Sequence, residues 1–377
     1  MGRTMLVTLL ITHRCNLRCR YCYVRSYHDV VMSMETACKC ITDAFSDAIG
    51  KFDRLEFAFL GGEPFCVFDR LREICEWTWS QRWPLPYLIS ASTNGTLCTS
   101  KVCRWLTEHH DRFYLSLSFD GLIGAQDRNR CKSSDQIDLD FFHQHWPSIP
   151  VKMTITEENV DCLYQNIHML HARGIQVNDT FADGVPAWKD SSLHILDQQL
   201  QMLCNDQLEH PQPHPSDLLS IDLTRILMTE TRSLFSCEAG ISRFTYDWDG
   251  KKYGCHLLSP LALSNQQLTE LSASMKAPRP VFSPCHSCDL DALCPSCEGN
   301  NIRLNGNPWL REEKNCKLFR HQLYYACVFQ MKRILKKDEW GEDDRRIFGS
   351  IQKIIQTRPM REVVCRIYRN SGIESGS

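Results

Sequence analysis

The sequence lacks the features of a membrane or exported protein. The largely apolar segment Met5–Ile11 is too short to span a bilayer, and no small-residue cleavage site follows it. No longer apolar run and no export signal occurs elsewhere. We therefore expect a chain without a membrane partner that stays in the reducing cytosol.

The sequence also lacks an excess of charge of either sign. It contains 43 Lys and Arg residues against 45 Asp and Glu residues, so its formal net charge is -2. This balance gives no general reason to expect a nucleic-acid partner or a charged membrane surface. There is no internal repeat or low-complexity tract, and 377 residues that are 43% hydrophobic can form one large domain and a smaller one.

Cysteine, in contrast, is abundant, with 21 residues. In a reducing compartment most of them cannot form disulfides, so metal ligation is the leading explanation wherever they cluster. Two regions are dense in cysteine, one near the amino terminus and one beyond residue 236.

Apolar runs alternate with helix-like segments in the first half of the chain. The expected strands are Met5–Ile11, Leu55–Leu60, Tyr87–Ala91, Phe113–Phe119, Val151–Ile155 and Ile175–Phe181, and the expected helices include Met34–Phe52, Phe68–Trp79 and Val160–Ala172. Strand alternating with helix predicts parallel strands with helical crossovers. Six such units predict an α/β fold, a partial (β/α)6 TIM-type barrel whose reactive groups lie at the carboxyl ends of the strands.

Polar or glycine-containing turns follow the first four expected strands. They are the three-cysteine stretch, Gly61–Pro64, Thr93–Gly95 and Asp120–Gly121, which we expect to meet on one rim. The pattern then changes to helical stretches broken by HPQPHPS at residues 210–216. We expect a barrel over residues 1–184, a helical bridge over 185–236, a small cysteine-rich domain over 237–320, and a basic helical tail over 321–377 with a short polar end.

The amino-terminal cysteines have the spacing Cys15-x3-Cys19-x2-Cys22. One short loop can thereby place three thiolates around a small iron–sulfur centre, with Arg14, Arg18 and Arg20 able to offset its negative charge. A cubane cluster normally takes four such ligands, so three leave one iron open. The spacing alone is also compatible with a zinc knuckle or with reduced, inert cysteines.

With Tyr21 before Cys22, the stretch resembles the C-x3-C-x-aromatic-C signature of the radical S-adenosylmethionine enzymes. The resemblance implies that Cys15, Cys19 and Cys22 hold a catalytic [4Fe-4S] cluster. It also implies that the open iron chelates S-adenosylmethionine, whose reductive cleavage gives a 5′-deoxyadenosyl radical. An external electron donor resembling a flavodoxin or ferredoxin is then expected.

Further segments resemble the cosubstrate-binding motifs of that family. Gly61-Gly62-Glu63-Pro64 matches its G-G-E-P motif, in which glycines allow close approach and a carboxylate suits the ammonium group. The other candidate contacts are Tyr21, Thr93, Asn94, Ser118, Asp120 and Arg130. Arg130 is suited to a carboxylate. The three segments that carry Thr93 and Asn94, Ser118 and Asp120, and Arg130 could also be turns or surface charges.

The second cysteine region resembles the SPASM extension of radical S-adenosylmethionine enzymes that modify peptides. Its cysteines are Cys237, Cys255, Cys285, Cys288, Cys294, Cys297 and Cys316, with Gly250 five residues before Cys255. The resemblance implies two auxiliary clusters, one on Cys285, Cys288, Cys294 and Cys316 and one on Cys237, Cys255 and Cys297. Cys294 and Cys297 are separated by two residues rather than the usual three. Two close cysteine pairs alone would also fit a zinc ribbon.

The resemblance narrows the reaction without naming the substrate. Relatives that form formylglycine in sulfatases commonly carry an Asp base after the second cysteine of the extension, and this chain has His256 there. We therefore place His256 and Asp120 at the catalytic site, with His256 accepting a proton. The favoured reaction is an oxidative side-chain crosslink, such as a cyclophane, in a ribosomally made precursor peptide. Formylglycine formation, peptide epimerisation, and a non-catalytic zinc-binding or electron-transfer protein are the alternatives.

Only fourteen residues precede Cys15. We accordingly expect the leader of the precursor peptide to be held by the barrel, by the bridge or by another protein. The other eleven cysteines, including Cys38, Cys40, Cys66 and Cys75, fit packing on helix faces better than ligation.

Overall fold

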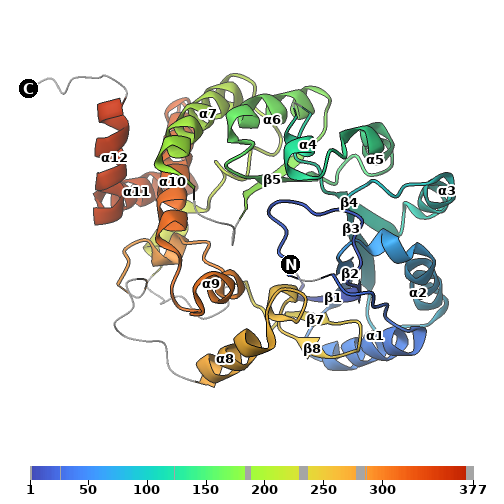
Figure 1. Ribbon diagram of the computed structural model, residues 1–377. Coiled ribbons are helices and arrows are strands. Elements are labelled where there is room, and N and C mark those ends of the chain that lie inside the picture. The colour runs from blue at the N-terminus through green and yellow to red at the C-terminus, as the bar shows by residue number, and fades with distance from the viewer. Residues whose placement is uncertain are drawn as a thin grey trace, which may run out of the picture. The chain divides into compact units, whose positions relative to one another are not determined.

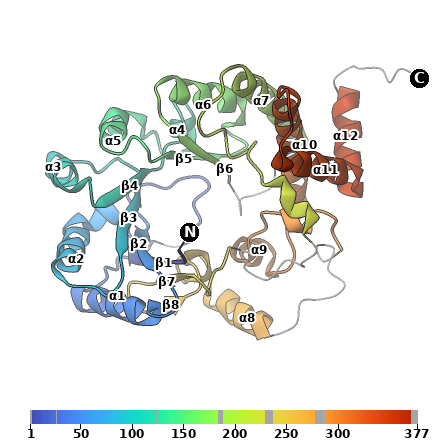
Figure 2. The ribbon, with the colours of Figure 1, turned by 180° about the vertical axis from the view of Figure 1, so that it is seen from behind.

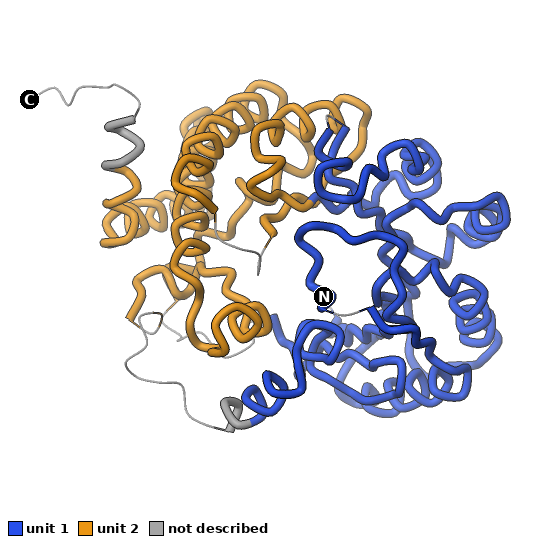
Figure 3. Tube along the Cα trace, viewed as in Figure 1, with its two compact units in different colours: residues 1–153, 235–272 blue, residues 154–234, 273–377 orange. Residues whose placement is uncertain are grey.

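The computed structural model describes residues 2–25, 27–122, 124–182, 188–228, 237–276, 285 and 287–370. It divides into two compact units, shown in Figure 3. Unit 1 comprises residues 1–153 and 235–272, and unit 2 comprises residues 154–234 and 273–377. The domain boundaries expected from the sequence stay a prediction, and the one at residues 184 and 185 lies outside the described residues.

Unit 1 is built on a six-stranded sheet in the order β4-β3-β2-β1-β7-β8. The strands are β1 (Thr4–Thr12), β2 (Arg54–Gly61), β3 (Tyr87–Thr93), β4 (Phe113–Leu117), β7 (Arg243–Tyr246) and β8 (Lys252–Tyr253). All neighbours from β4 to β7 are parallel, and only β7 and β8 are antiparallel. The expected α/β class with parallel strands is confirmed (Figure 1).

The central strand β1 explains why the sheet extends in both directions. Val7, Leu9 and Leu10 are fully buried, because β2 pairs along one edge of β1 and β7 along the other. The sequence did not predict β7, which has only four residues and comes from far along the chain. A strand buried on both faces needs a partner on each edge, and β7 supplies the second.

Helices cover the sheet of unit 1, among them α1 (Met34–Ala48), α2 (Phe68–Ser80) and α3 (Ser100–His109). The Ser33 side chain caps α1. This helix ends at Ala48 and not at the expected Phe52, because the chain turns through Gly50 at φ +74°. Unit 1 also contains the short helices η1 (Pro64–Val67), α4 (Ala125–Asn129), η2 (Ser134–Gln136), α5 (Leu139–His145) and η5 (His256–Leu258), and most of helix α8 (Asn265–Lys276).

Strands β5 (Val151–Ile155) and β6 (Val177–Phe181) form a separate two-stranded sheet. A parallel bridge between Ser118 and Lys152 places the start of β5 just beyond the end of β4. The six strands expected from the sequence are therefore all present, but the last two are not in the main sheet (Figure 2).

Unit 2 is mostly helical. Its elements include η3 (Val160–Cys162), α6 (Leu163–Ala172), α7 (Asp190–Glu209), η4 (Leu223–Leu227), η6 (Asp291–Leu293), α9 (Glu298–Asn305), α10 (Glu313–Leu335), α11 (Glu342–Gln356) and α12 (Arg358–Asn370). Leu223, Leu323, Ile354 and Met360 form a buried core. Helices α7 and η4 lie within the expected bridge, and α10 to α12 lie in the carboxyl-terminal segment, whereas the polar end at residues 371–377 lies outside the described residues. Within the described part of the chain, no helix has the length and apolarity needed to cross a bilayer.

Candidate functional site

The three amino-terminal cysteines lie on the loop that leaves the carboxyl end of β1. Backbone hydrogen bonds shape this loop: the Cys22 amide donates to the Cys19 carbonyl at 3.1 Å, and the Leu17 amide donates to Cys15 Sγ at 3.4 Å. The Cys19 thiol interacts electrostatically with Cys22, and the Cys15 thiol with Cys19. The loop therefore places the three thiols as neighbours.

The thiols fit an iron–sulfur cluster in kind, as three soft ligands on one loop at the end of a strand. Burial raises the pKa of Cys15 to about 12 and that of Cys19 to about 11, so both are neutral until a metal displaces their protons. Among the described side chains, no three potential ligands are already gathered in metal-binding geometry.

Gly61 and Gly62 bring the second motif into direct contact with the cysteine loop. The Gly62 amide donates to the Thr12 carbonyl at 3.1 Å, and the Glu63 amide donates to the Arg14 carbonyl at 2.7 Å. A Cβ at residue 61 would lie 2.0 Å from the Thr12 oxygen, and one at residue 62 would lie 2.2 Å from the Arg14 oxygen. Only glycine permits this approach, so these residues position the loop as well as leaving room for a ligand.

Glu63 is a buried carboxylate at the centre of the motif. It is 2% exposed and accepts hydrogen bonds from Thr93 Oγ1 at 2.8 Å, the Asn94 amide at 2.7 Å and the Phe65 amide at 3.0 Å. Burial raises its pKa to about 7, although these hydrogen bonds oppose the rise. Its neighbour Pro64 begins η1. A cation placed beside Glu63 would therefore favour its ionised form.

Asp120, Tyr21 and Arg130 form a second polar group beside the cysteine loop. The Tyr21 hydroxyl donates to Asp120 Oδ2 at 2.7 Å, and Arg130 Nε lies 3.1 Å from the same oxygen. The Arg130 guanidinium lies 5.1 Å from the centre of the Tyr21 ring. The Ser118 amide donates a hydrogen bond to the Thr93 carbonyl at 2.8 Å, which links the end of β4 to the end of β3. The structure thus joins residues from the ends of β3 and β4 to the cysteine loop.

Two cysteines near the loop were not expected at the site. Cys66 interacts electrostatically with Cys15 and accepts a hydrogen bond from the Asn16 amide. Cys131 Sγ accepts a hydrogen bond from the Arg18 amide at 3.1 Å. No spacing rule links either residue to the Cys15–Cys22 loop, so the sequence carried no signal for them.

A cation that was not expected, Arg130, also acts on the cysteine loop. Arg14 pairs with Asp29, and the Arg18 guanidinium lies 3.7 Å from the centre of the Tyr27 ring. The charge that lowers the pKa of Cys19 most, against the larger effect of burial, is that of Arg130.

His256 lies in unit 1 on η5, directly after Cys255. Its ring packs against Tyr23 with centroids 5.0 Å apart, which places it beside the residue that follows Cys22. Burial, assisted by the positive charge of Lys152, lowers the pKa of His256 to about 4. The imidazole is therefore neutral at physiological pH, and the same burial makes it a weaker base than an exposed histidine. Sequence reasoning did not anticipate Tyr23 or Lys152 as its neighbours.

Four of the later cysteines are neighbours within unit 2. Cys288 interacts electrostatically with Cys285 and Cys294, and Cys316 does so with the same two residues. Arg311 Nη1 donates to Cys294 Sγ at 3.1 Å. These are the four cysteines that the SPASM resemblance groups into one cluster.

The other three cysteines are divided between the units. Cys237 and Cys255 are electrostatic neighbours in unit 1, whereas Cys297 belongs to unit 2. Gly250, which precedes Cys255, adopts φ +82° in the turn between β7 and β8. The grouping of these three cysteines stays a prediction.

Comparison with known proteins supports this reading of the fold. Residues 2–120 match the family described as "4Fe-4S single cluster domain", a segment that contains Cys15, Cys19 and Cys22. The serine-type anaerobic sulfatase-maturating enzyme of Klebsiella aerogenes is 27% identical over 184 residues, which are 45% of this chain and 45% of that protein. The matched segments span 38% to 54% of the curated relatives.

Solved structures match over most of the chain. The structure of anSMEcpe with bound AdoMet and the Cp18Cys peptide is 18% identical, with a TM-score of 0.61, and the match covers 86% of this chain and 97% of that one. Streptococcus suis SuiB bound to the precursor peptide SuiA is 13% identical, with a TM-score of 0.58, covering 83% of this chain and 76% of that one. The resemblance to radical S-adenosylmethionine maturases is thus confirmed, and the chain has their fold.

Proposed function

We propose that this chain is a radical S-adenosylmethionine enzyme that abstracts hydrogen from a ribosomally made precursor peptide and installs an oxidative crosslink between side chains, such as a cyclophane. Cys15, Cys19 and Cys22 would hold the catalytic [4Fe-4S] cluster. The cysteines of the second region would hold two auxiliary clusters, and an external flavodoxin-like or ferredoxin-like protein would supply electrons.

The observation that carries this proposal is the buried carboxylate of Glu63 beside the cysteine loop. Its two oxygens are oriented by Thr93 and Asn94, and the Glu63 amide is bonded to the loop itself. Burial opposes ionisation of Glu63, and its hydrogen bonds and the charge of Arg130 offset that effect only in part, so a further cation beside it would favour the carboxylate. A zinc knuckle or an electron-transfer site would supply no such cation. The ammonium group of S-adenosylmethionine is such a cation.

Different residues of the site would bind different groups of the cosubstrate. Glu63 would accept hydrogen bonds from the ammonium group, and Arg130, oriented by Asp120 and Tyr21, would bind the carboxylate. Thr93 and Asn94 would contact the ribose or methionyl portion, and Ser118 would be a further contact. When bound to the cluster and reduced, the cosubstrate supplies a 5′-deoxyadenosyl radical that abstracts hydrogen.

His256 would take up the proton that an oxidised substrate releases. Its ring is neutral and packs on Tyr23, one residue beyond Cys22. An oxidative crosslink must also lose a second electron after hydrogen abstraction, and auxiliary clusters offer a route for it. This need favours the crosslink over epimerisation.

Formylglycine formation is the second candidate, favoured by the likeness to the sulfatase-maturating enzyme of Klebsiella aerogenes and to anSMEcpe. The likeness to SuiB, whose structure holds the precursor peptide SuiA, favours a small peptide substrate instead. The histidine at residue 256, where formylglycine-forming relatives commonly carry Asp, favours the crosslink.

The test is reconstitution of the chain without oxygen, followed by incubation with S-adenosylmethionine, a reductant and a short peptide encoded beside it. Formation of 5′-deoxyadenosine together with a peptide mass lower by about two units per crosslink would support the proposal. The mass falls because each of the two atoms that become bonded loses one hydrogen. A peptide mass that is unchanged in ordinary water, but higher by about one unit per modified residue in D2O, would instead identify epimerisation. A colourless protein containing zinc and no acid-labile sulfide would refute the enzymatic proposal.

A further inference from the structure

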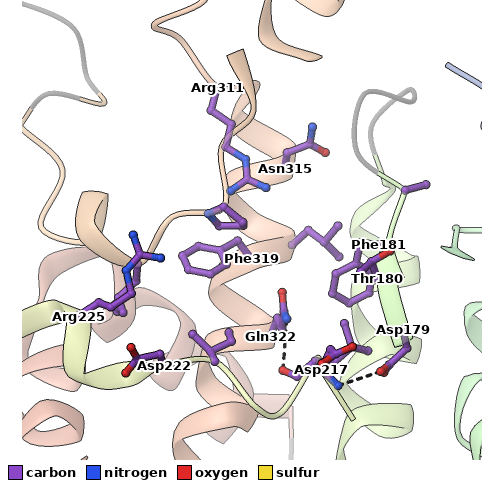
Figure 4. A pocket seen from close by; sticks show the side chains of 16 residues that line it. Asp179, Thr180, Phe181, Asp217, Asp222, Arg225, Arg311, Asn315, Phe319 and Gln322 are labelled. Atoms are coloured by element: carbon purple, nitrogen blue, oxygen red, sulfur yellow. Dashed lines mark hydrogen bonds between the residues drawn. The ribbon is translucent and has the colours of Figure 1, made fainter. Parts of the chain in front are cut away.

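Arg311 connects the second cysteine region to the start of α10. Its Nη1 donates a hydrogen bond to Cys294 Sγ at 3.1 Å. It lies on the wall of a pocket in unit 2, together with Leu293 and Pro295, the two residues that flank Cys294 (Figure 4). The proposed function uses the cysteines of this region as cluster ligands and gives Arg311 no role.

The chain holds Arg311 in place without the help of a metal. It directly precedes Glu312, whose side chain caps α10 by accepting hydrogen bonds from the Lys314 amide at 2.9 Å and the Asn315 amide at 3.1 Å. Its guanidinium carbon lies 5.7 Å from the centre of the Phe319 ring, which is seen below Arg311 in Figure 4. Arg311 is only 9% exposed, so its side chain has little room to move.

The chain also holds Cys294 in place. Its amide donates to the Leu290 carbonyl at 3.0 Å and to the Asp291 carbonyl at 3.2 Å. Leu290 and Leu293 belong to the buried core of unit 2, and Cys294 packs against that core. The hydrogen bond from Arg311 to Cys294 Sγ is therefore present before any metal binds, and we expect it to persist when Cys294 becomes a ligand.

The charge of Arg311 also reaches a second cysteine of the group. Burial raises the pKa of Cys316 to about 11, and the charge of Arg311 opposes this rise more than that of Arg320 does. Arg320 also acts on Cys288, but its side chain is 26% exposed and its Nη1 lies 3.6 Å from Glu362 Oε2. Solvent and the carboxylate both weaken its effect. Of the two arginines, Arg311 is the one that is buried and hydrogen-bonded to a cysteine sulfur.

A donor at a cysteine sulfur changes the reduction potential of an iron–sulfur cluster. Reduction adds one electron to the cluster, and part of the added negative charge falls on the sulfur atoms that hold it. A hydrogen-bond donor or a positive charge at such a sulfur stabilises the reduced form more than the oxidised form, so the potential rises. The Arg311 guanidinium offers both at one sulfur atom.

We propose that Arg311 is a positioning residue that raises the reduction potential of the cluster held by Cys285, Cys288, Cys294 and Cys316 through its hydrogen bond to Cys294 Sγ. This inference rests on the proposed function, because it takes these four cysteines to hold a [4Fe-4S] cluster. A higher potential suits a centre that accepts the second electron of an oxidative crosslink. In that step the coupled substrate loses one electron and one proton, the cluster gains the electron, and a base takes the proton.

The experiment is a redox titration of the full, anaerobically reconstituted chain, followed by electron paramagnetic resonance. The titration step that disappears in Cys294→Ser belongs to the cluster on these cysteines. Arg311→Met removes the donor and the charge, so the midpoint potential of that step should fall. A roughly tenfold loss in the equilibrium constant for reduction equals about 59 mV for one electron. Arg311→Lys keeps the charge without the guanidinium geometry and should give a smaller fall.

Arg333→Met is the matched control. The Arg333 guanidinium carbon lies 5.5 Å from the centre of the Phe329 ring, an arrangement like that of Arg311 with Phe319, but Arg333 lies in the last turn of α10. Its replacement should leave the midpoint unchanged.

Two results would overturn the proposal. One is an unchanged midpoint in Arg311→Met with full iron content, and the other is an equal shift in Arg333→Met. If Arg311→Met assembles no cluster, Arg311→Lys decides, and an unchanged midpoint in that variant overturns the proposal as well.

The outcome is separable from that of the proposed function. A lowered midpoint in Arg311→Met, in a chain that forms no crosslink, would support the role of Arg311 and refute the proposed reaction. Crosslinked product together with an unchanged midpoint would refute the role of Arg311 alone. A wild-type chain without any titration step that depends on Cys294 would refute the cluster on these cysteines and this inference with it.

Discussion

The two cysteine regions of this molecule are held in different ways. The Cys15–Cys22 loop leaves a central strand and is bonded through its backbone to the Gly61–Pro64 turn, with buried Glu63 and Asp120 beside it. Cys288 and Cys294, by contrast, lie in short turns around η6, and they are fixed mainly because Leu290 and Leu293 pack into the apolar core beneath α10 and α11. The strand and the backbone hydrogen bonds hold the first region without any metal. The second region consists mainly of short turns with little regular secondary structure.

This difference indicates what metal does in each region. Four parallel strands impose the position of the amino-terminal loop, so a cluster there adds chemistry more than structure. Turns of three or four residues have few hydrogen bonds, so a cluster there would contribute folding free energy directly. Substitutions in the first region should therefore damage activity, and those in the second should damage stability.

The largest effect is expected from replacing Cys15, Cys19 and Cys22 together by Ala. Without thiolates the catalytic cluster cannot form, so 5′-deoxyadenosine production should fall to background, while α1 and the sheet keep their melting profile. Cys38→Ala is the matched control, because Cys38 is half-buried on α1 outside either region. Retained cleavage in the triple variant would contradict the assignment of these ligands.

His256→Ala tests whether the second region takes part in the chemistry. If the imidazole accepts the substrate proton, crosslinked product should fall by roughly a hundredfold, the lower range for a general base, while 5′-deoxyadenosine production falls much less. The two products are measured in one reaction by mass spectrometry. Equal losses of both would mean that His256 serves packing against Tyr23 only.

Glu63→Gln keeps the shape of the buried side chain and removes its charge. Loss of one charge-assisted hydrogen bond should weaken S-adenosylmethionine binding by roughly ten- to a hundredfold, measured by equilibrium dialysis at pH 8, where Glu63 is ionised. Glu56→Gln is the control, because Glu56 is half-buried on β2, the strand that precedes the Gly61–Pro64 turn. Unchanged affinity would mean that Glu63 only positions the cysteine loop.

Cys294→Ser should reduce the stability of its region more than it reduces activity, which is the opposite of what we expect for the amino-terminal variants. The iron content should fall by about four atoms per chain, as for the loss of one cubane, and amides of the turns from Cys288 to Cys294 should exchange faster with solvent. Cys103→Ser, in α3, is the control for removal of a thiol. Full iron content with unchanged hydrogen exchange would show that this region does not depend on metal.

The sequence was sufficient where patterns are local and periodic. Alternating apolar runs predicted β1 to β6 to within a few residues, and the turn after each of the first four strands correctly indicated which residues would meet. It failed where the partner lies far away in sequence: β7 beside β1, Lys152 beside His256, and Cys66 beside Cys15. None of these contacts has a fixed spacing, so only the folded chain brings them together. The end of α1 was missed because Gly50 outweighed the helical pattern that continues to Phe52.

The last prediction compares Asp179, a buried carboxylate of unit 2, with Glu63 in unit 1, and it concerns stability and not activity. Burial raises the pKa of Asp179 from its ordinary 3.8 to about 6, against hydrogen bonds from Ser216 and Asp217. The folded state therefore holds its proton more tightly than the unfolded state, and stability falls as pH rises from about 4 to about 6. Asp179→Asn removes this decline, on the order of 2–3 kcal/mol between pH 4 and pH 7 for a shift of about two pKa units. Urea midpoints of both proteins at the two pH values give the difference. An identical pH dependence in wild type and variant would mean that Asp179 is ionised at little cost, and that the carboxylate of unit 2 is better solvated than its burial indicates.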